Sequence, residues 1–505
     1  MATELITERY ESEIAGVLNC YDRVIIGGYL QPFGYAKGMT KYLYQNQVRI
    51  FDYTKELAQP LREEIRANAE AIAEREGVKI EFMSKSKMRK EDRVQEVLKE
   101  RGNEAGLVCI LSAMEQCQAY KPWHSPESGY SYLVTTQGKC LHYYFYFMDE
   151  ALGLCYMRVP TWCPFRLQFY FNGHNALATK LSQAGIEYEL ADNAFLQIGD
   201  FEQANVLAKL NVEELHERLD SYARQYCPVV ERLELSYRWS ITQAEFATDI
   251  VFRSQNSLQM MLPPLMETLI QAVKPADIAT FLGRKLNSQY QDEMGNRFNH
   301  RWLGRRIKHT MGPVSIKMYD KFNAVLRIET TVNDLSFFKH YRTVSHRDGS
   351  SSKKFAKMQR TIYSFSPLSE TLLAVNHRYL KFISAIDTPE AGVEKLHQLT
   401  ETIDEKDHRY KGFNLLSEED SSLLRHLLNG QFLIQGFSNK ALRQLLPHKN
   451  SGQISRLLRR LRVHGLIRKV PRCHRYYLTV FGRQAAILAL KLRDLLIIPH
   501  LAFQH

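Results

Sequence analysis

The residues best suited to chemistry lie between residues 304 and 331, where cations, a tyrosine and carboxylates recur at the spacing of β-strands. The segment predicts three strands, at residues 304–309, 314–321 and 324–331. Strand alternation places Lys317, Tyr319 and Lys321 on one face of the middle strand, and Arg327 and Glu329 on one face of the third. A hairpin between these strands would bring the five side chains together.

Such a group of side chains suits the chemistry of phosphodiester bonds. Acidic groups hold Mg²⁺ or Mn²⁺, lysine and arginine bind the scissile phosphate, and a tyrosine can attack it. The predicted phosphate-binding residues are Lys308, Lys317, Lys321 and Arg327, and the candidate nucleophile is Tyr319. Ion pairing across a solvated sheet face explains the same pattern without any activity, and this alternative stays open.

Two further carboxylates precede this segment. Residues 231–239 predict a strand and residues 241–252 a helix, on which Glu245 and Asp249 stand four residues apart and so share one face. The candidate catalytic groups are therefore Asp249, Glu245, Asp320, Glu329 and Tyr319. The candidate metal ligands are Asp249, Asp320 and Glu329, with Mg²⁺ or Mn²⁺ as the predicted cofactor.

Residues 451–475 carry the clearest signal for nucleic-acid binding. A helix from Ser451 would bury a leucine-rich stripe, expose arginines on its other sides and end at Gly465, before two short strands around a basic turn. This order is typical of a winged helix-turn-helix, which inserts the helix into a DNA groove. The predicted contacts are Arg456, Arg459, Arg460, Arg462, Arg468, Lys469, Arg472 and Arg475. A solvated basic helix is the alternative.

Positive charge is concentrated in two separate blocks. Residues 406–505 contain 18 Lys or Arg against 5 Asp or Glu, a net charge of +13, and residues 296–360 contain 15 against 4, a net charge of +11. Because the whole chain carries +12, the remainder is acidic. Nucleic-acid-binding proteins segregate charge in this way, so the second block also predicts such contacts, including Lys353 and Lys354 in a Gly/Ser/Lys-rich loop.

The length of 505 residues predicts several domains. We expect an α+β multidomain protein with these parts: an α/β domain at residues 1–118, an aromatic-rich antiparallel sheet with helices at 119–230, a basic central domain at 231–405, and a winged helix-turn-helix at 406–505. The polar N-terminus, the lack of a long apolar run and eight cysteines without a CxxC pair predict a cytoplasmic protein with no membrane contact. The last helix, near residues 481–496, is a candidate homodimer contact.

Two resemblances bear on these expectations. The sequences KMYDK and RIE are similar to the core of rolling-circle replication initiators that lack a His-hydrophobic-His motif, and the match implies that Glu329 binds a metal. That family also uses a nucleophilic tyrosine, but no YSxR-like stretch identifies one here. Over its whole length the chain resembles bacterial proteins of unassigned role labelled for a MarR-like winged helix. The stretches that carry this likeness are RVPTWCPFRLQFYFNGHN, QAEFATDIVF, NHRYL and HGLIRKVP.

The sequence therefore predicts a nucleic-acid-binding protein of a mobile genetic element, acting as a metal-dependent endonuclease or nicking enzyme on DNA. Two alternatives stay open. One is a non-catalytic winged-helix regulator. The other is a protein that binds a structured RNA together with duplex DNA, using the aromatic segment at residues 120–171 and its interleaved polar groups. Those polar groups are Arg158, Arg166, Tyr170 and Asn172.

Overall fold

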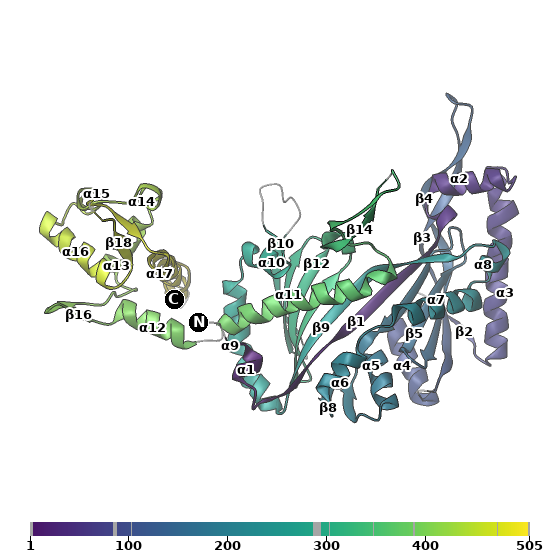
Figure 1. Cartoon of the computed structure of the whole chain (residues 1–505), viewed down its shortest axis with the longest axis horizontal. Helices are drawn as coiled ribbons and strands as arrows, with labels where there is room; N and C mark the ends of the chain where they lie inside the picture. The colour runs from purple at the N-terminus through teal and green to yellow at the C-terminus, as the bar shows by residue number, and fades with distance from the viewer. Residues whose placement is uncertain are drawn as a thin grey trace. The chain divides into compact units, whose positions relative to one another are not determined.

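The chain is a mixed α+β protein that divides into two compact units, Met1–Asp387 and Thr388–His505 (Figure 1). The computed structural model describes residues 4–83, 88–102, 104–285, 294–301, 304–346, 348–386, 389–471 and 473–502. None of the helices within these ranges is both long enough and apolar enough to cross a lipid bilayer.

One large sheet organises the first unit. Its 11 strands follow the order β10-β11-β12-β13-β9-β1-β6-β5-β4-β3-β2. In that order they are Met294–Arg301, Gly304–Met311, Val314–Lys321, Val325–Val332, Tyr237–Phe252, Ile14–Leu30, Leu167–Asn172, Gly153–Pro160, Ser131–Asp149, Gly106–His124 and Ile80–Phe82. Neighbours are antiparallel except β2 and β3, which are parallel. The central strands β1 and β9 therefore join the two halves of the sheet.

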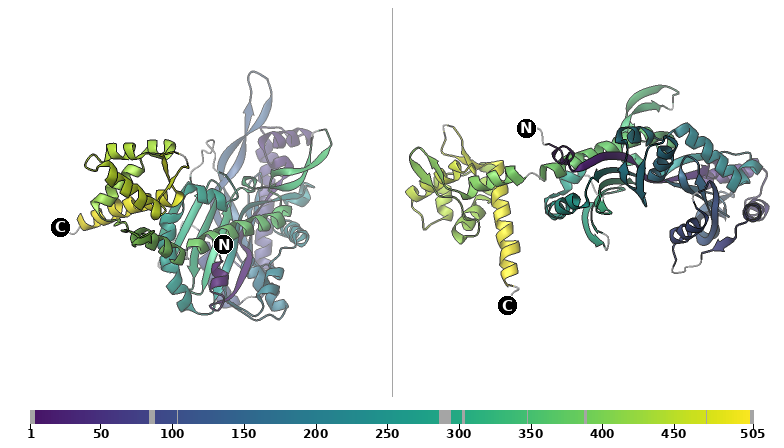
Figure 2. Two further views of the ribbon diagram at one scale, coloured as in Figure 1. Left: turned by 60° about the vertical axis from the view of Figure 1, so that its left-hand side comes forward. Right: turned by 90° about the horizontal axis from the view of Figure 1, so that it is seen from below.

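Helices cover both faces of this sheet (Figure 2). On one face, α11 (Phe365–Ile386) packs on β9 and β13, and the rings of α7 (Val212–Tyr226) stack on the phenylalanines of β4 and β6. On the other face, α5 (Gly173–Gln183) and α6 (Phe201–Leu207) pack on β1, and α4 (Lys90–Arg101) packs on β3. This second face stays partly open over β11, β12 and β13, where lysines lie half-buried.

The remaining elements of the first unit are short or lie at its edges. The helices are α1 (Ile6–Arg9), α2 (Ala36–Gln45), α3 (Gln59–Arg75), α8 (Val229–Arg232), α9 (Gln255–Ala272) and α10 (Pro275–Phe281). The single-turn elements are η1 (Gln31–Phe33), η2 (Thr54–Ala58), η3 (Leu335–Phe337) and η4 (Ile362–Ser364). Two small hairpins complete it, β7 (Tyr188–Ala191) with β8 (Ala194–Ile198), and β14 (Lys339–Ser345) with β15 (Ser351–Lys357).

The second unit is built mainly of helices around its own apolar core. Its elements are α12 (Pro389–Thr400), β16 (Ile403–Glu405), β17 (His408–Tyr410), α13 (Glu418–Leu427), α14 (Gly430–Gln435), α15 (Asn439–Leu445), α16 (Ser451–Val463), β18 (Ile467–Lys469), β19 (Tyr476–Leu478), α17 (Val480–Lys491), η5 (Leu492–Ile497) and α18 (Ile498–Ala502). Asn450 caps α16, whose buried stripe contains Ile454, Leu458 and Leu461. Gly465 follows with a φ of +73°, which ends the helix as the sequence predicts.

The structure differs from the sequence prediction in four places. The predicted boundary between residues 405 and 406 falls within the β16–β17 hairpin of the second unit, which begins at Thr388. Residue 118 lies inside β3 and residue 230 inside α8, so strands on both sides of these predicted domain boundaries belong to one sheet. Residues 1–118 contribute long, mainly antiparallel strands instead of an α/β unit. Residues 241–252 form most of strand β9, not a helix, because β1 and β13 pair with them on either side.

Candidate functional site

The candidate site lies on the partly open face of the sheet, at a β-bulge in β1. Tyr21 pairs with Phe246 and Val24 with Ala244, so Asp22 and Arg23 together oppose the single residue Glu245. The bulge interrupts the alternation of side chains along β1, and Asp22 contacts Asn172 and Arg327 on the face that carries Glu245. Asp22 therefore joins the face that carries Glu245, and an acidic group from a third strand reaches the predicted site.

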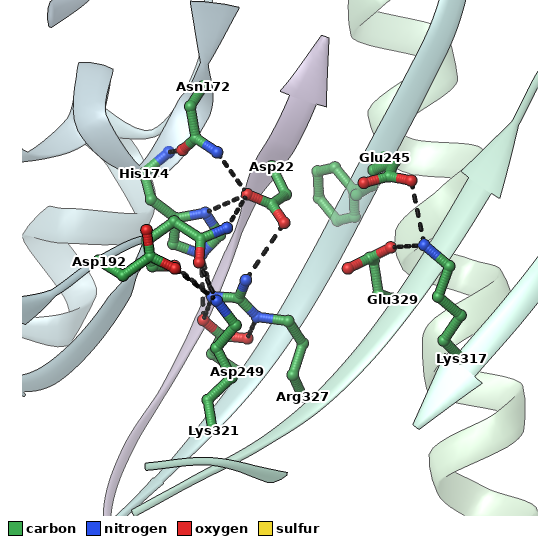
Figure 3. A network of polar contacts seen from close by, with 12 residues as sticks. Asp22, Asn172, His174, Asp192, Glu245, Asp249, Lys317, Lys321, Arg327 and Glu329 are labelled. Atoms are coloured by element: carbon green, nitrogen blue, oxygen red, sulfur yellow. Dashed lines mark hydrogen bonds and ion pairs between the residues drawn. The ribbon is translucent and has the colours of Figure 1, made fainter. Parts of the chain in front are cut away.

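Arg327 is fully buried at the centre of an ion-pair network (Figure 3). Its Nε donates to Asp249 Oδ1 at 2.6 Å and its Nη2 to Asp249 Oδ2 at 2.6 Å, which makes a two-pronged pair. Its Nη1 donates to Asp22 Oδ2 at 3.2 Å, and Nη2 also reaches the carbonyl of Asn193 at 2.6 Å. Because its nitrogens are buried and already donate to these partners, the Arg327 guanidinium has a structural role and cannot bind a phosphate.

His174, also fully buried, completes the network from the first turn of α5. Its Nε2 lies 3.0 Å from Asp249 Oδ2, and its Nδ1 lies 3.3 Å from Asp22 Oδ1. Asn172 caps the helix and also donates to Asp22 at 2.6 Å. The start of the helix lies so close to β1 that a Cβ at position 173 would be only 2.0 Å from the carbonyl oxygen of Tyr21, so this position needs glycine.

The charges in this network hold one another in their ionised forms. Burial by itself would raise the pKa of Asp249, but the Arg327 guanidinium and His174 outweigh it and lower that pKa below its ordinary value. The same balance lowers the pKa of Asp22. For His174, burial and the Arg327 charge oppose the imidazolium, yet nearby Cys20 and the hydrogen bonds to Asp22 and Asp249 raise its pKa well above its ordinary value. His174 Nε2 also lies 2.9 Å from Arg327 Nη2, so the imidazole and the guanidinium share the Asp249 carboxylate.

This balance predicts a loss of stability in acid. Because the pKa of Asp249 is lower in the folded chain than in the unfolded chain, its stabilising effect is complete above the ordinary carboxyl pKa of about 3.9 and is lost as the pH falls below it. Asp249→Asn should lower the free energy of unfolding by about 3 kcal/mol at neutral pH. The difference from wild type should shrink as the pH falls through the carboxyl range.

Urea unfolding followed by circular dichroism at a series of pH values would measure this difference. Glu217→Gln is the matched control, because Glu217 is exposed on α7 and its side chain makes no hydrogen bond or ion pair among the described residues. A gap between Asp249→Asn and wild type that stays constant down to pH values well below about 3.9 would contradict the assigned shift.

A second group of polar side chains lies beside the first, on β9, β12 and β13. Lys317 Nζ donates to Glu329 Oε1 at 2.5 Å and to Glu245 Oε1 at 3.0 Å. The Tyr319 hydroxyl donates to Glu329 Oε2 at 2.5 Å. Glu329 is buried, whereas Glu245 and Lys317 remain partly exposed, with 13% and 15% of their side chains accessible. This part of the network therefore faces the solvent.

The pKa shifts in this second group follow from burial and from the closeness of the two glutamates. Burial and the neighbouring Glu329 carboxylate raise the pKa of Glu245 despite Lys317. Burial disfavours a charged Lys317, but the two glutamates raise its pKa above the ordinary value. Burial and Glu329 also raise the pKa of Tyr319 well above its ordinary value, which disfavours the phenolate that a nucleophile needs.

Three carboxylates from these groups converge as a candidate cation site. Asp22, Glu245 and Glu329 each offer one oxygen, and the three oxygens lie within 4.8 Å of one another (Figure 3). Oxygens that share Mg²⁺ at about 2.1 Å lie about 3.0 Å apart when adjacent and about 4.2 Å apart when opposite, so the set would contract on binding the ion. Counting Asp249 as well, four carboxylates lie around Arg327 and Lys317, with His174 between Asp22 and Asp249.

This set differs from the metal ligands predicted from the sequence. Of Asp249, Asp320 and Glu329, only Glu329 belongs to it. Asp249 is occupied by Arg327 and His174, as described above. Asp320 lies on the opposite face of β12 from Lys317 and Tyr319, because it stands at an odd spacing from them on the strand. Asp22 and Glu245 take the places of Asp249 and Asp320.

The predicted phosphate-binding residues of the first unit lie in different environments. Lys321 contacts Asp192 and Asn193 and is held within the network. Arg327 is buried, so this prediction is wrong for that residue. Lys308 lies half-buried directly opposite Lys317 on β11, and burial with the neighbouring cations lowers its pKa. Lys353 and Lys354 are exposed on β15.

In the second unit, Arg456, Arg459, Arg468, Lys469 and Arg475 are exposed on α16 and the β18–β19 hairpin, as the sequence predicts. Arg460 instead donates to Asp420 at 3.0 Å and covers the Phe413 ring at 3.8 Å, so it holds α16 on α13. Arg462 pairs with Glu405 at 3.3 Å. The predicted contact Arg472 lies outside the described residues.

Sequence reasoning missed Asp22, His174 and Asn193. The segment LNCYDRVII does contain a signal for Asp22, since a carboxylate inside an otherwise apolar strand needs a buried partner. The run FNGHN similarly combines an N-cap, a glycine and a histidine at the start of an apolar helix. Neither signal identifies Arg327 as the partner, which lies 305 positions from Asp22 in the chain.

Comparisons of this chain with protein-family models, with curated protein sequences and with solved structures give no match.

Proposed function

We propose that this protein binds nucleic acid and acts as a metal-dependent endonuclease or nicking enzyme on DNA, as part of a mobile genetic element. The observation that carries the proposal is the convergence of Asp22, Glu245 and Glu329 from three neighbouring strands within 4.8 Å. Oxygen ligands of this kind suit Mg²⁺ or Mn²⁺. The site lies beside Lys308 and Lys317, on the open face of a basic segment.

In this proposal the side chains contribute to phosphodiester cleavage by their charge and their position. A divalent cation at the three carboxylates would polarise the scissile phosphate and lower the pKa of a bound water. Lys317 would exchange its glutamate partners for the phosphate once the cation neutralises them, and Lys308 would support it from the next strand. Tyr319 remains a candidate nucleophile, but its raised pKa favours attack by water instead.

The second unit supports a DNA-binding role through a proposed winged helix-turn-helix. In this proposal α13, α15 and α16 form the helical part, with α16 in the major groove, and the β18–β19 hairpin forms the wing. Exposed arginines on α16 and the hairpin provide the phosphate contacts. The proposed likenesses to MarR-like winged helices and to rolling-circle initiators agree with a second unit that binds duplex DNA and a first unit that cuts DNA.

An exposed apolar stripe along α17, η5 and α18 supports the proposed homodimer. Leu488, Leu495 and Leu501 are each at least 64% exposed, and they recur at spacings of seven and six residues. Apolar positions at such spacings suit a helix pairing with a second copy. A dimer would present two α16 helices to two half-sites on one duplex.

The cutting assay tests the enzymatic proposal directly. Supercoiled and single-stranded DNA incubated with Mg²⁺ or Mn²⁺ should be nicked or cleaved, and EDTA should prevent it. Intact DNA in both forms with both metals, from protein that binds DNA in the same buffer, would overturn the enzymatic proposal and leave the binding proposal standing.

One observation favours the non-catalytic regulator as a second candidate. Lys317 already pairs with both Glu245 and Glu329, so the carboxylates are satisfied without a cation. In that case the network would be a purely structural device that fixes β9, β12 and β13, and the protein would protect a specific duplex from digestion without cutting it.

The winged-helix proposal predicts a specific loss of duplex binding. Arg456→Ala with Arg459→Ala should weaken duplex binding and reduce the slope of log affinity against log salt by about 0.9 for each lost phosphate contact. Fluorescence anisotropy at several salt concentrations measures both quantities. Arg483→Ala with Lys491→Ala is the matched control, since it removes two exposed cations from α17. Equal losses in the two double variants would count against α16 as the recognition helix.

A further inference from the structure

The β14–β15 hairpin projects from the body of the first unit as a separate two-stranded ribbon (Figure 1, Figure 2). Its base is anchored, because Phe338 and Met358 are buried and the Met358 amide donates to the Phe338 carbonyl at 2.9 Å. Beyond this base, the described residues of the ribbon are largely exposed. The ribbon therefore contributes little to the core of the unit.

One face of the ribbon combines aromatic rings with lysines. Tyr341 lies directly opposite Phe355, and both side chains are 67% exposed. Alternation places three exposed lysines on the same face, since Lys339 pairs with Lys357 two positions away on one side and Lys353 pairs with Thr343 on the other. None of the eight residues on this face, which also carries the Ser345–Ser351 pair, is acidic.

This combination of exposed rings and lysines suits a ligand with both flat apolar groups and negative charge. Two large rings left in water at the same level of a ribbon form a small apolar platform, and the flanking lysines attract phosphate. Bases stacked within a duplex have their faces hidden, whereas unpaired bases offer them. Base–aromatic stacking in a basic surface is how single strands are held without sequence preference.

We propose that the face made by Lys339, Tyr341, Thr343, Lys353, Phe355 and Lys357 binds unpaired bases of a single-stranded nucleic acid. Tyr341 and Phe355 stack against bases, and the three lysines contact the flanking phosphates. The inference deepens the proposed function by naming an unpaired strand as the substrate. It rests on nucleic-acid binding but is independent of the cation site at Asp22, Glu245 and Glu329.

The test measures binding of short fluorescein-labelled oligonucleotides by fluorescence anisotropy. The probes are single-stranded DNA, single-stranded RNA of the same sequence, and the blunt DNA duplex. Tyr341→Leu with Phe355→Leu removes the rings and keeps apolar bulk. Tyr35→Leu with Phe51→Leu is the matched control, because these two rings are 61% and 60% exposed elsewhere in the unit.

The ribbon double variant should lose single-strand affinity by at least about 10-fold while its duplex affinity stays within about twofold of wild type. The control should bind all probes as wild type does. Loss on the DNA probe, on the RNA probe or on both identifies the natural strand. Lys353→Gln with Lys357→Gln should in addition lower the salt dependence of single-strand binding.

Several results would overturn the inference. Unchanged single-strand affinity in the ribbon variant, with a wild-type circular dichroism spectrum, would refute stacking by these rings. Equal losses on single strand and duplex would also refute it. Binding of wild type to anionic vesicles, lost in the ribbon variant while single-strand binding persists, would assign the face to a membrane surface. A wild-type protein that binds none of the three probes would refute the proposed function as well.

Discussion

Replacing Arg327 by leucine is expected to lower the free energy of unfolding of the chain by about 3–5 kcal/mol. The guanidinium is fully buried and is shared by Asp249 and Asp22, which lie on two other strands. Its removal leaves two carboxylates in the interior without their main counter-charge. Such a loss is costly because water cannot solvate the buried carboxylates in place of the guanidinium.

Urea unfolding at neutral pH, followed by circular dichroism, measures this change. Arg238→Leu is the matched control, since Arg238 is exposed on β9 and should change stability by no more than about 0.5 kcal/mol. The double variant Arg327→Leu with Asp249→Asn should be less destabilised than the sum of the single variants, because the two side chains interact directly. A loss below about 1 kcal/mol for Arg327→Leu would show that the network is not the anchor described here.

Replacing Glu329 by glutamine is expected to reduce metal-dependent cutting by at least about 100-fold while DNA binding is retained. The amide keeps the shape of the side chain but removes one negative charge from a set of three carboxylates. A hard cation then loses its buried ligand. Cutting is measured as the rate of conversion of supercoiled to nicked DNA, and binding by fluorescence anisotropy on the same preparation.

The variant Asp320→Asn distinguishes this cation site from the set of metal ligands predicted by the sequence. Asp320 lies on the opposite face of β12, so its variant should cut at a rate close to that of wild type. Asp22→Asn should behave like Glu329→Gln. Full activity in Glu329→Gln would show that the cation site takes no part in cutting, and loss of activity in Asp320→Asn alone would favour the metal ligands predicted from the sequence.

Local features of the site were predictable where they depend on short-range spacing. The β12–β13 hairpin, and the pairing of Lys317 with Glu329 across it, follow from alternation in two strands joined by a short turn. The amphipathic helix α16 and its end at Gly465 likewise follow from a 3.6-residue period and a helix-terminating glycine. In both cases the partners lie close in sequence, so few alternatives compete.

The region around Glu245 was not predictable in the same way. Two carboxylates four residues apart share a face in a helix, and they also share a face in a strand, because four is an even number. The spacing of Glu245 and Asp249 therefore could not distinguish the two structures. Pairing with β1 and β13, which are remote in sequence, decided in favour of the strand.

By itself, the sequence determined that cations, carboxylates and a tyrosine gather at residues 304–331, and that a basic helix and hairpin lie near the C-terminus. Only the tertiary structure decided which carboxylates meet. A bulge in β1 brings Asp22 to the face that carries Glu245 and Glu329. Arg327 and Asp249 pair with each other in the interior, so neither can contact a substrate. The physical reason is that a strand's face and a charge's burial depend on partners far away in the chain, which local periodicity does not specify.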